Sequence, residues 1–384
     1  MLNRNFFKLS NKKFSCAFYN THRNKSVKTG IVMLNMGGPQ NNDQVQDYLY
    51  RIMTDTDMIQ LPLQKFLGPF IAKKRTPAVQ KKYNEIGGSS PILKWTNIQG
   101  ELLCKKLDDI CPKSAPHKHY VAFRYVSPFT EDTLQQIEND KVERIILFSQ
   151  YPQYSCATSG SSFNTIYSYY KRKPFPQSIK WSIIDRWGTH PLLVKTFAEK
   201  IVDELNQFPE TIRSKVVIIF SAHSLPIEAV NRGDSYPSEV AATTEAVMAK
   251  LGYRNPYVLT WQSRVGPVSW LGPFTDVAIE EYVKKGIKNF ILVPIAFVNE
   301  HIETLHEMDI EYCQDLGKKV GVELIRRVAA PNDHPLFIEA LSDLVSRHLC
   351  GEESINPKFL LRCPSCTNVR CHESKQWFHK LCSV

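Results

Sequence analysis

The N-terminal end of this sequence lacks acidic residues. No Asp or Glu precedes Asp43, although seven Lys and Arg residues do, and hydroxyl-bearing and aromatic side chains lie between them. A basic, hydroxyl-rich and acid-free segment is typical of a mitochondrial transit peptide. Residues 1–27 are therefore predicted to be such a peptide, with a basic tail of no folded role as the alternative.

Long apolar runs are also missing, since none reaches the roughly 18–20 residues that a spanning helix needs. The longest, residues 289–298, is predicted to be a buried strand. There is no secretory signal to accompany the ten cysteines, so a disulfide framework is not expected. Beyond the N-terminal segment, the excess of positive charge is scattered rather than gathered into a stripe, so no nucleic-acid partner is expected. The chain is expected to be soluble or peripheral to a membrane.

Short β-branched runs alternate with longer helical patterns, which indicates α/β architecture with parallel sheets flanked by helices. The candidate strands are apolar almost throughout, as expected for strands that are covered on both faces. They are residues 30–36, 120–125, 144–150 and 180–184 in the first half, and 215–222, 257–262, 289–297 and 323–328 in the second.

The two halves resemble each other, because residues 142–149 parallel residues 287–294, and residues 120–124 parallel residues 257–261. We therefore expect two similar Rossmann-like domains, with a ligand in the cleft at the carboxyl ends of their strands. The predicted division is 28–188 for a first domain that carries a pocket lip, 189–350 for a second domain and 351–384 for a C-terminal extension.

Polar side chains follow two of the second-half strands. His223 comes directly after one strand, and Glu300, His301 and Glu303 come after another, with Glu307 and Glu311 at further four-residue steps. Residues four apart share a helix face, so the last three carboxylates form an acidic ladder. Taken singly, His223 could be a structural histidine, and the three carboxylates could lie on a solvated helix face. Together they favour a site that receives a cation and carries protons away.

Nine short segments carry a resemblance to a known family. They are residues 34–39, 86–91, 123–126, 149–155, 220–226, 230–234, 261–263, 270–273 and 301–304. In order and in content they resemble ferrochelatases, and the resemblance covers roughly residues 29–384. It implies a lyase that inserts Fe²⁺ into protoporphyrin IX to form protoheme, the terminal step of heme biosynthesis.

The resemblance also implies roles for single residues. It makes His223 the proton acceptor or metal-handling group and Glu303 its partner carboxylate, and it gives His190 and Asp343 active-site roles as well. The implied substrate-binding residues are Arg75, Tyr83, Ser90, Met36, Arg124, Tyr125, Trp270 and His301. A neutral imidazole suits this chemistry, because two pyrrole protons must leave as the dication enters. One departure is Glu300, which stands where animal members usually carry Asp.

The C-terminal extension contains Cys363, Cys366 and Cys371, a C-x2-C-x4-C pattern that supplies three metal ligands. Spacing alone slightly favours zinc. It also leaves the fourth ligand open among Cys156, Cys350, His372 and Cys382. The resemblance implies Cys156 as that ligand and a [2Fe–2S] cluster as the cofactor, since such a cluster takes four thiolates.

Residues 52–71 are rich in apolar side chains and are followed by the basic residues Lys73, Lys74 and Arg75. A helical segment packed in the core is one interpretation. An apolar lip beside basic residues also suits an anionic membrane surface, and the resemblance favours this second interpretation. It further implies a homodimer bound peripherally to the matrix side of the mitochondrial inner membrane.

Two other functions remain compatible with these observations. One is a non-catalytic heme carrier or redox sensor, and the other is a chelatase for cobalt or nickel. The pairing of His223 with Glu303 favours catalysis over carriage, because a carrier needs neither a base nor an acidic exit.

Overall fold

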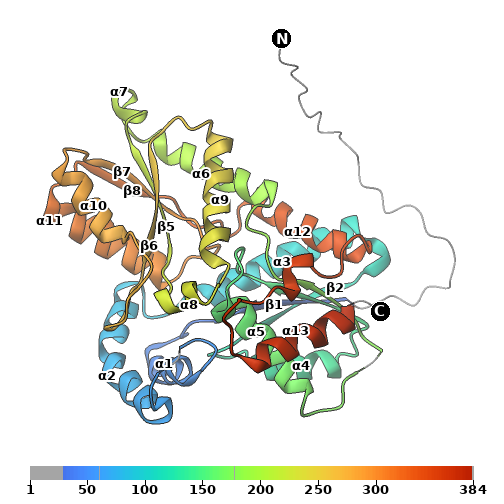
Figure 1. The fold of residues 1–384 in the computed structure, drawn as a ribbon. Helices are drawn as coiled ribbons and strands as arrows, with labels where there is room; N and C mark the ends of the chain where they lie inside the picture. The colour runs from blue at the N-terminus through green and yellow to red at the C-terminus, as the bar shows by residue number, and fades with distance from the viewer. Residues whose placement is uncertain (1–28, 60, 177, 383–384) are drawn as a thin grey trace.

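The computed structural model describes residues 29–59, 61–176 and 178–382, so the predicted transit peptide lies outside the described residues. Two four-stranded sheets, each with helices around it, form two lobes (Figure 1). Their strand orders are β2-β1-β3-β4 and β6-β5-β7-β8, and every pairing between named strands is parallel. The predicted α/β fold with two similar Rossmann-like units is therefore confirmed.

The strands lie within a few residues of the predicted positions. They are β1 (Thr29–Asn35), β2 (His117–Phe123), β3 (Arg144–Ser149), β4 (Lys180–Ile184), β5 (Val217–His223), β6 (Tyr257–Gln262), β7 (Asn289–Pro294) and β8 (Leu324–Arg327). Strand β2 begins three residues before its predicted start, and at β7 the apolar run continues to residue 297 but the strand ends at Pro294. Proline carries no N–H and cannot extend the ladder of hydrogen bonds.

Helices connect the strands and cover the sheets. In the first lobe they are α1 (Val45–Thr54), α2 (Gln64–Glu85), α3 (Ile92–Ile110), α4 (Thr130–Asn139) and α5 (Ser161–Tyr170). The second lobe has α6 (Pro191–Leu205), α7 (Glu210–Arg213), α8 (Ile227–Asn231), α9 (Tyr236–Leu251), α10 (Thr275–Lys284), α11 (Gly317–Val320) and α12 (Pro335–Leu349), and the tail adds α13 (Val369–Cys382). Two segments, Cys156–Gly160 and Glu303–Leu316, are π-helical.

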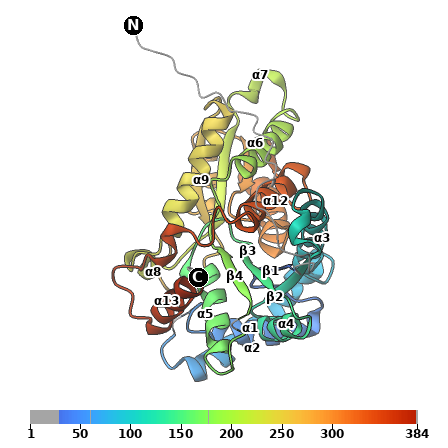
Figure 2. The ribbon, with the colours of Figure 1, turned by 90° about the vertical axis from the view of Figure 1, so that its right-hand side faces the viewer.

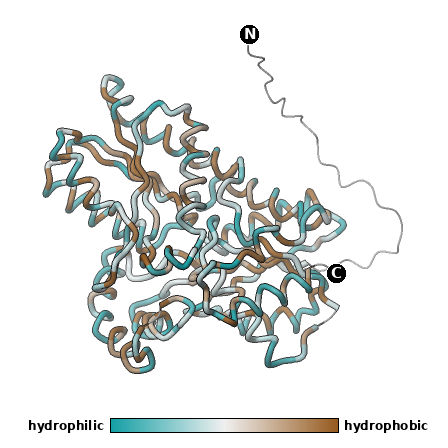
Figure 3. The backbone as a smooth tube through the Cα atoms, in the orientation of Figure 1, coloured by the Kyte–Doolittle hydropathy of each residue, from teal (hydrophilic) through white to brown (hydrophobic). Residues whose placement is uncertain are grey.

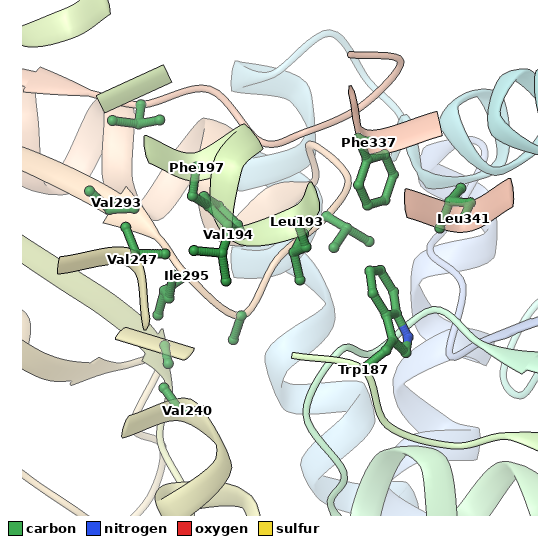
Figure 4. Packing of buried hydrophobic residues seen from close by; sticks show 14 of the residues in the cluster. Trp187, Leu193, Val194, Phe197, Val240, Val247, Val293, Ile295, Phe337 and Leu341 are labelled. Atoms are coloured by element: carbon green, nitrogen blue, oxygen red, sulfur yellow. The ribbon is translucent and has the colours of Figure 1, made fainter. Parts of the chain in front are cut away.

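One hydrophobic cluster joins the two lobes. It contains Ile31 and Phe148 from the first sheet together with Phe220 and Val293 from the second, all fully buried. Figure 4 shows part of it, where side chains of α6, α9 and α12 pack together with Trp187. In Figure 3 the hydrophobic colour follows the strands, and hydrophilic residues are frequent on the surrounding helices. The lobes are therefore held together by shared apolar packing.

The tail packs on the first lobe rather than standing apart. Helix α13 contacts α5 and β4, as Figure 2 shows with α13 beside α5. Phe163 of α5 meets Phe359 and Phe378 edge to face, with ring centroids 5.4 and 5.5 Å apart. Both tail phenylalanines are buried. The tail therefore buries its apolar side chains against the core of the first lobe.

Among the described residues, no helix combines the length and the apolarity that crossing a membrane requires. Helix α2 and the residue before it nevertheless expose large apolar side chains. Leu63 and Phe66 are each 75% exposed and Phe70 is 64% exposed. The predicted lip segment is thus helical in its second part, and its outer face is not packed into the core.

Candidate active site

His223 and Glu303 form a hydrogen-bonded pair. His223 is the last residue of β5, and Glu303 opens the π-helix that follows β7. The Nδ1 atom of His223 lies 2.8 Å from Oε2 of Glu303. Strands β5 and β7 are parallel neighbours, so their carboxyl ends bring the two side chains to one edge of the sheet.

This pair strongly perturbs the acidity of both groups. Burial by itself lowers the pKa of His223, but the Glu303 carboxylate more than compensates, and the pKa lies above its ordinary value. Burial also opposes ionisation of Glu303, yet the charge and hydrogen bond of His223 bring the pKa of Glu303 down to about 2. Glu303 therefore stays a carboxylate, and it stabilises an imidazolium at His223.

Ser263 joins Glu303 to the next carboxylate of the ladder. Its hydroxyl donates to Oε2 of Glu303 at 3.2 Å and to Oε2 of Glu307 at 2.5 Å. The backbone N–H of Ser263 and the hydroxyl of Tyr312 also donate to Glu307, each at 2.7 Å. Burial and the neighbouring Glu303 charge raise the pKa of Glu307. A partly buried carboxyl with a raised pKa can take up and release a proton more easily near neutral pH.

The outer end of the predicted ladder has different partners. Glu311 pairs with Lys82 of α2 at 2.6 Å and with Nδ1 of His306 at 3.2 Å. Glu300 does not belong to the ladder, because Arg327 binds both of its oxygens at 2.8 and 3.1 Å. The segment is also π-helical rather than the α-helix implied by four-residue steps. Only Glu303 and Glu307 share a direct hydrogen-bonding partner in Ser263.

Two further rings, those of Trp270 and His301, lie beside the pair within the second lobe. The ring of Trp270 meets that of His223 edge to face, with centroids 6.5 Å apart. Nε2 of His301 lies 4.0 Å from Glu303, and its Nδ1 is 3.0 Å from the carbonyl of Asn299. Burial lowers the pKa of His301 despite the nearby carboxylate, so this second imidazole is neutral at a pH where His223 is charged.

The first lobe contributes tyrosines and a methionine. Burial and, after it, the Glu303 charge raise the pKa of Tyr83, a buried residue of α2. Tyr151 accepts a hydrogen bond from the backbone N–H of Met36 at 2.9 Å, directly after β1. Met36 packs in a cluster that also includes Ile302, the residue before Glu303. The predicted residues Met36 and Tyr83 therefore lie on the first-lobe side of the same junction.

The other predicted substrate residues of the first lobe differ in their contacts. Ser90 is buried, and its N–H donates to the carbonyl of Pro39 at 2.7 Å. Arg75 on α2 makes no hydrogen bond or ion pair to any residue that the structure describes, and burial lowers its pKa. Arg124 and Tyr125 both donate to Oδ2 of Asp55, Tyr125 at 2.8 Å.

His190 and Asp343 form a separate pair. Nε2 of His190, at the start of α6, lies 2.9 Å from Oδ2 of Asp343 on α12, and Arg347 binds the same oxygen at 2.7 Å. Within the described part of the chain, neither residue makes a hydrogen bond or ion pair with His223 or Glu303. The structure therefore shows two hydrogen-bonded pairs, His223 with Glu303 and His190 with Asp343, that share no direct hydrogen bond.

The four predicted cluster cysteines line one cavity of about 200 Å³. Cys156 comes from the π-helical turn before α5, and Cys363, Cys366 and Cys371 come from the tail. The same cavity is lined by the cationic residues Arg186, Arg232, Arg362 and Lys375. The other three candidates for a fourth ligand, Cys350, His372 and Cys382, do not line it.

A loop of the second lobe closes against the tail near this cavity. The N–H of Ser365 donates to the carbonyl of Arg232 at 3.2 Å. Gly233 has φ +100°, and a Cβ there would lie 2.4 Å from Cδ of Pro364. Only glycine fits this backbone conformation and this close approach. Cysteines from the first lobe and the tail thus meet beside a loop of the second lobe.

In the ranges that the structure describes, no three His, Cys, Asp or Glu side chains are grouped closely enough to hold a metal ion. Sequence reasoning also missed functional neighbours. Ser263 and Asp55 became visible only through their contacts, although Ser263 lies inside one of the recognised segments. Its φ of +66° is unusual for a residue with a side chain, and it places the hydroxyl between two carboxylates.

Comparisons with known proteins agree with this geometry. The ferrochelatase family model matches residues 28–349. The mitochondrial ferrochelatase of Drosophila melanogaster is 68% identical over 356 residues, which cover 93% of each chain. The mitochondrial ferrochelatase of Homo sapiens is 54% identical over 354 residues, which cover 92% of this chain and 84% of the human protein.

Among solved structures, SirB from Bacillus subtilis with Fe³⁺ has a TM-score of 0.50 at 10% identity, and it covers 85% of this chain and 97% of its own. This similarity concerns the fold alone. The family model and the long, highly identical relatives show that the chain belongs to the ferrochelatase family.

Proposed function

We propose that the His223–Glu303 pair is the centre at which this chain inserts ferrous iron into protoporphyrin IX and so forms protoheme. Membership of the family supplies the reaction. The observation that carries the assignment of the centre is the 2.8 Å contact between an imidazole and a carboxylate that stays ionised. The reaction needs such a pair, because two protons leave the porphyrin as the dication enters.

His223 acts as the proton acceptor. Its Nδ1 is engaged by Glu303, and no described residue makes a hydrogen bond to its Nε2. The neutral tautomer with the proton on Nδ1 therefore presents a basic Nε2 to a pyrrole N–H. The Glu303 charge stabilises the imidazolium that forms, which is why the pKa of His223 is raised.

The released protons leave along the carboxylates of the π-helix. The Ser263 hydroxyl lies 3.2 Å from an oxygen of Glu303 and 2.5 Å from an oxygen of Glu307, so its one proton can be directed at either carboxylate. The raised pKa of Glu307 suits a group that is protonated and deprotonated in turn. Glu311 is more exposed than Glu303 and lies beside Lys82 and His306, so it forms the outer end of the route.

The porphyrin is held between the two lobes. Arg75 has no ionic partner among the described residues, so it is available for a propionate of the substrate. Trp270 beside His223 and Met36 on the first-lobe side provide apolar surface for the ring. Arg124 and Tyr125 complete the first-lobe side, and His190 with Asp343 forms a second hydrogen-bonded acid–base pair.

A heme carrier would explain the apolar surface but not the ionised pair or the linked Glu303 and Glu307. The family match favours iron over cobalt or nickel as the inserted metal. These observations together favour catalysis over carriage.

The cysteine cavity is proposed to hold a [2Fe–2S] cluster on Cys156, Cys363, Cys366 and Cys371. Four thiols line one cavity, which matches the four thiolates that such a cluster takes. A two-iron cluster divides its ligands between two metal ions, so its thiols need not converge on one point as they do around zinc. The cationic side chains in the wall offset the negative charge of the thiolates. When bound, the cluster supplies electron-transfer capacity and a covalent link between the tail and the first lobe.

Relatives are named mitochondrial, and the chain is assigned to the mitochondrion with them. We place it as a homodimer on the matrix side of the inner membrane, bound peripherally. Leu63, Phe66 and Phe70 are the exposed apolar residues that would enter the membrane surface, next to Lys73 and Lys74. Sedimentation of the purified chain as a monomer at micromolar concentration would contradict the dimer.

Replacing the proposed base should stop turnover. A general base contributes roughly 100-fold or more to a rate, so His223→Ala should lose at least that factor in heme formation from Fe²⁺ and protoporphyrin IX without oxygen. Porphyrin binding without iron should be largely kept. His334→Gln, on a histidine at the start of α12 outside the site, serves as the control. Full turnover in His223→Ala would remove this residue from the mechanism.

The pH profile should respond to Glu307. The Glu307 charge helps to raise the pKa of His223, so Glu307→Gln should lower that pKa. His223 must be neutral to accept a proton, and activity therefore rises with pH through its pKa. The acidic limb of kcat/KM should then move to lower pH in Glu307→Gln, and it should not move in Glu323→Gln on the surface. A limb that stays in place or moves to higher pH would contradict this electrostatic coupling.

The fourth cluster ligand can be tested directly. Cys156→Ser and Cys363→Ser should each remove the visible absorption, iron and acid-labile sulfide of the purified protein, because each takes away one of four thiolates. Cys350→Ser, whose thiol does not line the cavity, should keep all three. A colourless wild-type protein that contains zinc would exclude the cluster.

The exposed face of α2 should govern membrane binding. Phe66→Ser combined with Phe70→Ser should weaken binding to anionic phosphatidylserine vesicles by about ten-fold or more, given the apolar area that two phenylalanines bury. Val202→Ser, an exposed apolar position on α6, is the control. Equal vesicle binding by the wild type, the double variant and Val202→Ser would contradict the proposal that this face of α2 enters the membrane surface.

A further inference from the structure

Two carboxylates in the turn after α1 connect the tail with the active-site arginine. Asp55 caps the end of α1, and Asp57 follows two residues later. Both side chains are largely removed from solvent, with 11% and 2% exposed. A buried carboxylate is stable only when its oxygens have partners, so the contacts of these two residues constrain their surroundings.

Asp57 holds the tail. Its Oδ1 accepts a hydrogen bond from Nδ2 of Asn368 at 2.9 Å and lies 3.4 Å from the guanidinium of Arg370. Its Oδ2 accepts from Asn164 of α5 at 3.0 Å. Asn368 lies between Cys366 and Cys371, and its Oδ1 accepts from the N–H of Cys371 at 3.2 Å. The loop that carries the cysteines is thus tied to Asp57 through one amide side chain.

Asp55 holds two residues of the proposed porphyrin site. Its Oδ2 accepts from the guanidinium of Arg124 and from the hydroxyl of Tyr125, the latter at 2.8 Å. Nε of Arg124 also donates to Ser161 at 3.0 Å, and Ser161 directly follows the π-helical turn of Cys156. Both hydrogen-bonding partners given for the Arg124 side chain, Asp55 and Ser161, therefore belong to segments next to the cysteine cavity.

Hydrogen bonds within the turn link the position of Asp57 to that of the Asp55 carboxylate. Oδ1 of Asp55 accepts from the N–H of Asp57 at 2.9 Å, and the Asp55 carbonyl accepts from the N–H groups of Met58 and Ile59 at 3.2 and 3.0 Å. Asp57 cannot shift without moving the amide that fixes the Asp55 carboxylate. The path from Asn368 to Arg124 contains only short polar contacts and one tight turn.

We propose that the Asp55–Asp57 turn is a positioning element that makes the placement of Arg124 and Tyr125 depend on the docking of the cysteine-bearing tail. The inference rests on the proposed role of Arg124 in holding the porphyrin. Asp55 and Asp57 are positioning residues, because they act through Arg124 and Tyr125. An undocked tail leaves Asp57 without two partners, and the turn then loses the geometry that orients Arg124.

The test measures the dissociation constant of protoporphyrin IX without iron, by quenching of tryptophan fluorescence in the full chain. Asp57→Asn and Asn368→Asp should each weaken binding by roughly five-fold, the effect of about one buried hydrogen bond. Asn368→Asp keeps the contact to Cys371 but places a carboxylate against Asp57. If Asp57→Asn fails to fold, Asn368→Asp alone tests the proposal. The iron and sulfide content of each variant is measured alongside its dissociation constant.

Glu373→Gln is the matched control. Glu373 binds Lys171 and Tyr167 at 2.9 and 3.0 Å, and so ties α13 to the end of α5 without contacting the turn. It should leave the dissociation constant unchanged. A five-fold loss in this variant, or no loss in Asp57→Asn and Asn368→Asp, would overturn the proposal.

A double-mutant cycle separates this inference from the proposed function. Arg124→Ala should weaken porphyrin binding, and adding Asn368→Asp should then have little further effect, because both changes act on the same guanidinium. Equal weakening in both backgrounds would reject the coupling while leaving the role of Arg124 intact. An unchanged dissociation constant in Arg124→Ala would instead remove Arg124 from the porphyrin site, and the inference with it.

Discussion

The hydrogen-bonded pair of His223 and Glu303 is the interaction on which the rest of the site depends. Glu303 is partly buried, and a second carboxylate, that of Glu307, is reached through the Ser263 hydroxyl. Two such charges are tolerated only because an imidazole, a serine hydroxyl and a tyrosine hydroxyl satisfy them. The same arrangement raises the pKa of His223 and lowers that of Glu303. The contacts that satisfy the two carboxylates are therefore also the contacts that set the pKa of His223 and of Glu303.

The two lobes have the same strand order but contribute different side chains to the site. The second lobe ends β5 in His223 and follows β7 with the π-helix, so it supplies the proposed base and the carboxylates. The first lobe ends β1 at Asn35 and Met36, and its helices supply Tyr83 and Arg75. Because the lobes share one hydrophobic cluster, groups from both are held at a fixed separation. A repeated fold thus produces a site with two chemically different sides.

Charged groups also mark the places where separate parts of the chain meet. Arg327 binds Glu300 and Asp309 within the second lobe, and Asp57 binds the tail. Gly233 allows the second lobe to approach Pro364 of the tail. Such contacts contribute modestly to the free energy of unfolding but fix geometry, because an unpaired buried charge is costly. The tail therefore belongs to the catalytic body rather than forming a unit of its own.

The sequence by itself determined the α/β class, the eight strands to within a few residues and the family, because hydrophobic period and short motifs are local properties. It also put forward His223, Glu303 and the four cysteines as candidate site residues. Only the tertiary structure decided that Ser263 links two carboxylates, that Glu300 pairs with Arg327, and that His190 pairs with Asp343. The link from the tail through Asp57 and Asp55 to Arg124 joins residues more than 200 positions apart. Such contacts leave no periodic signal, since they depend on how complete helices and sheets pack.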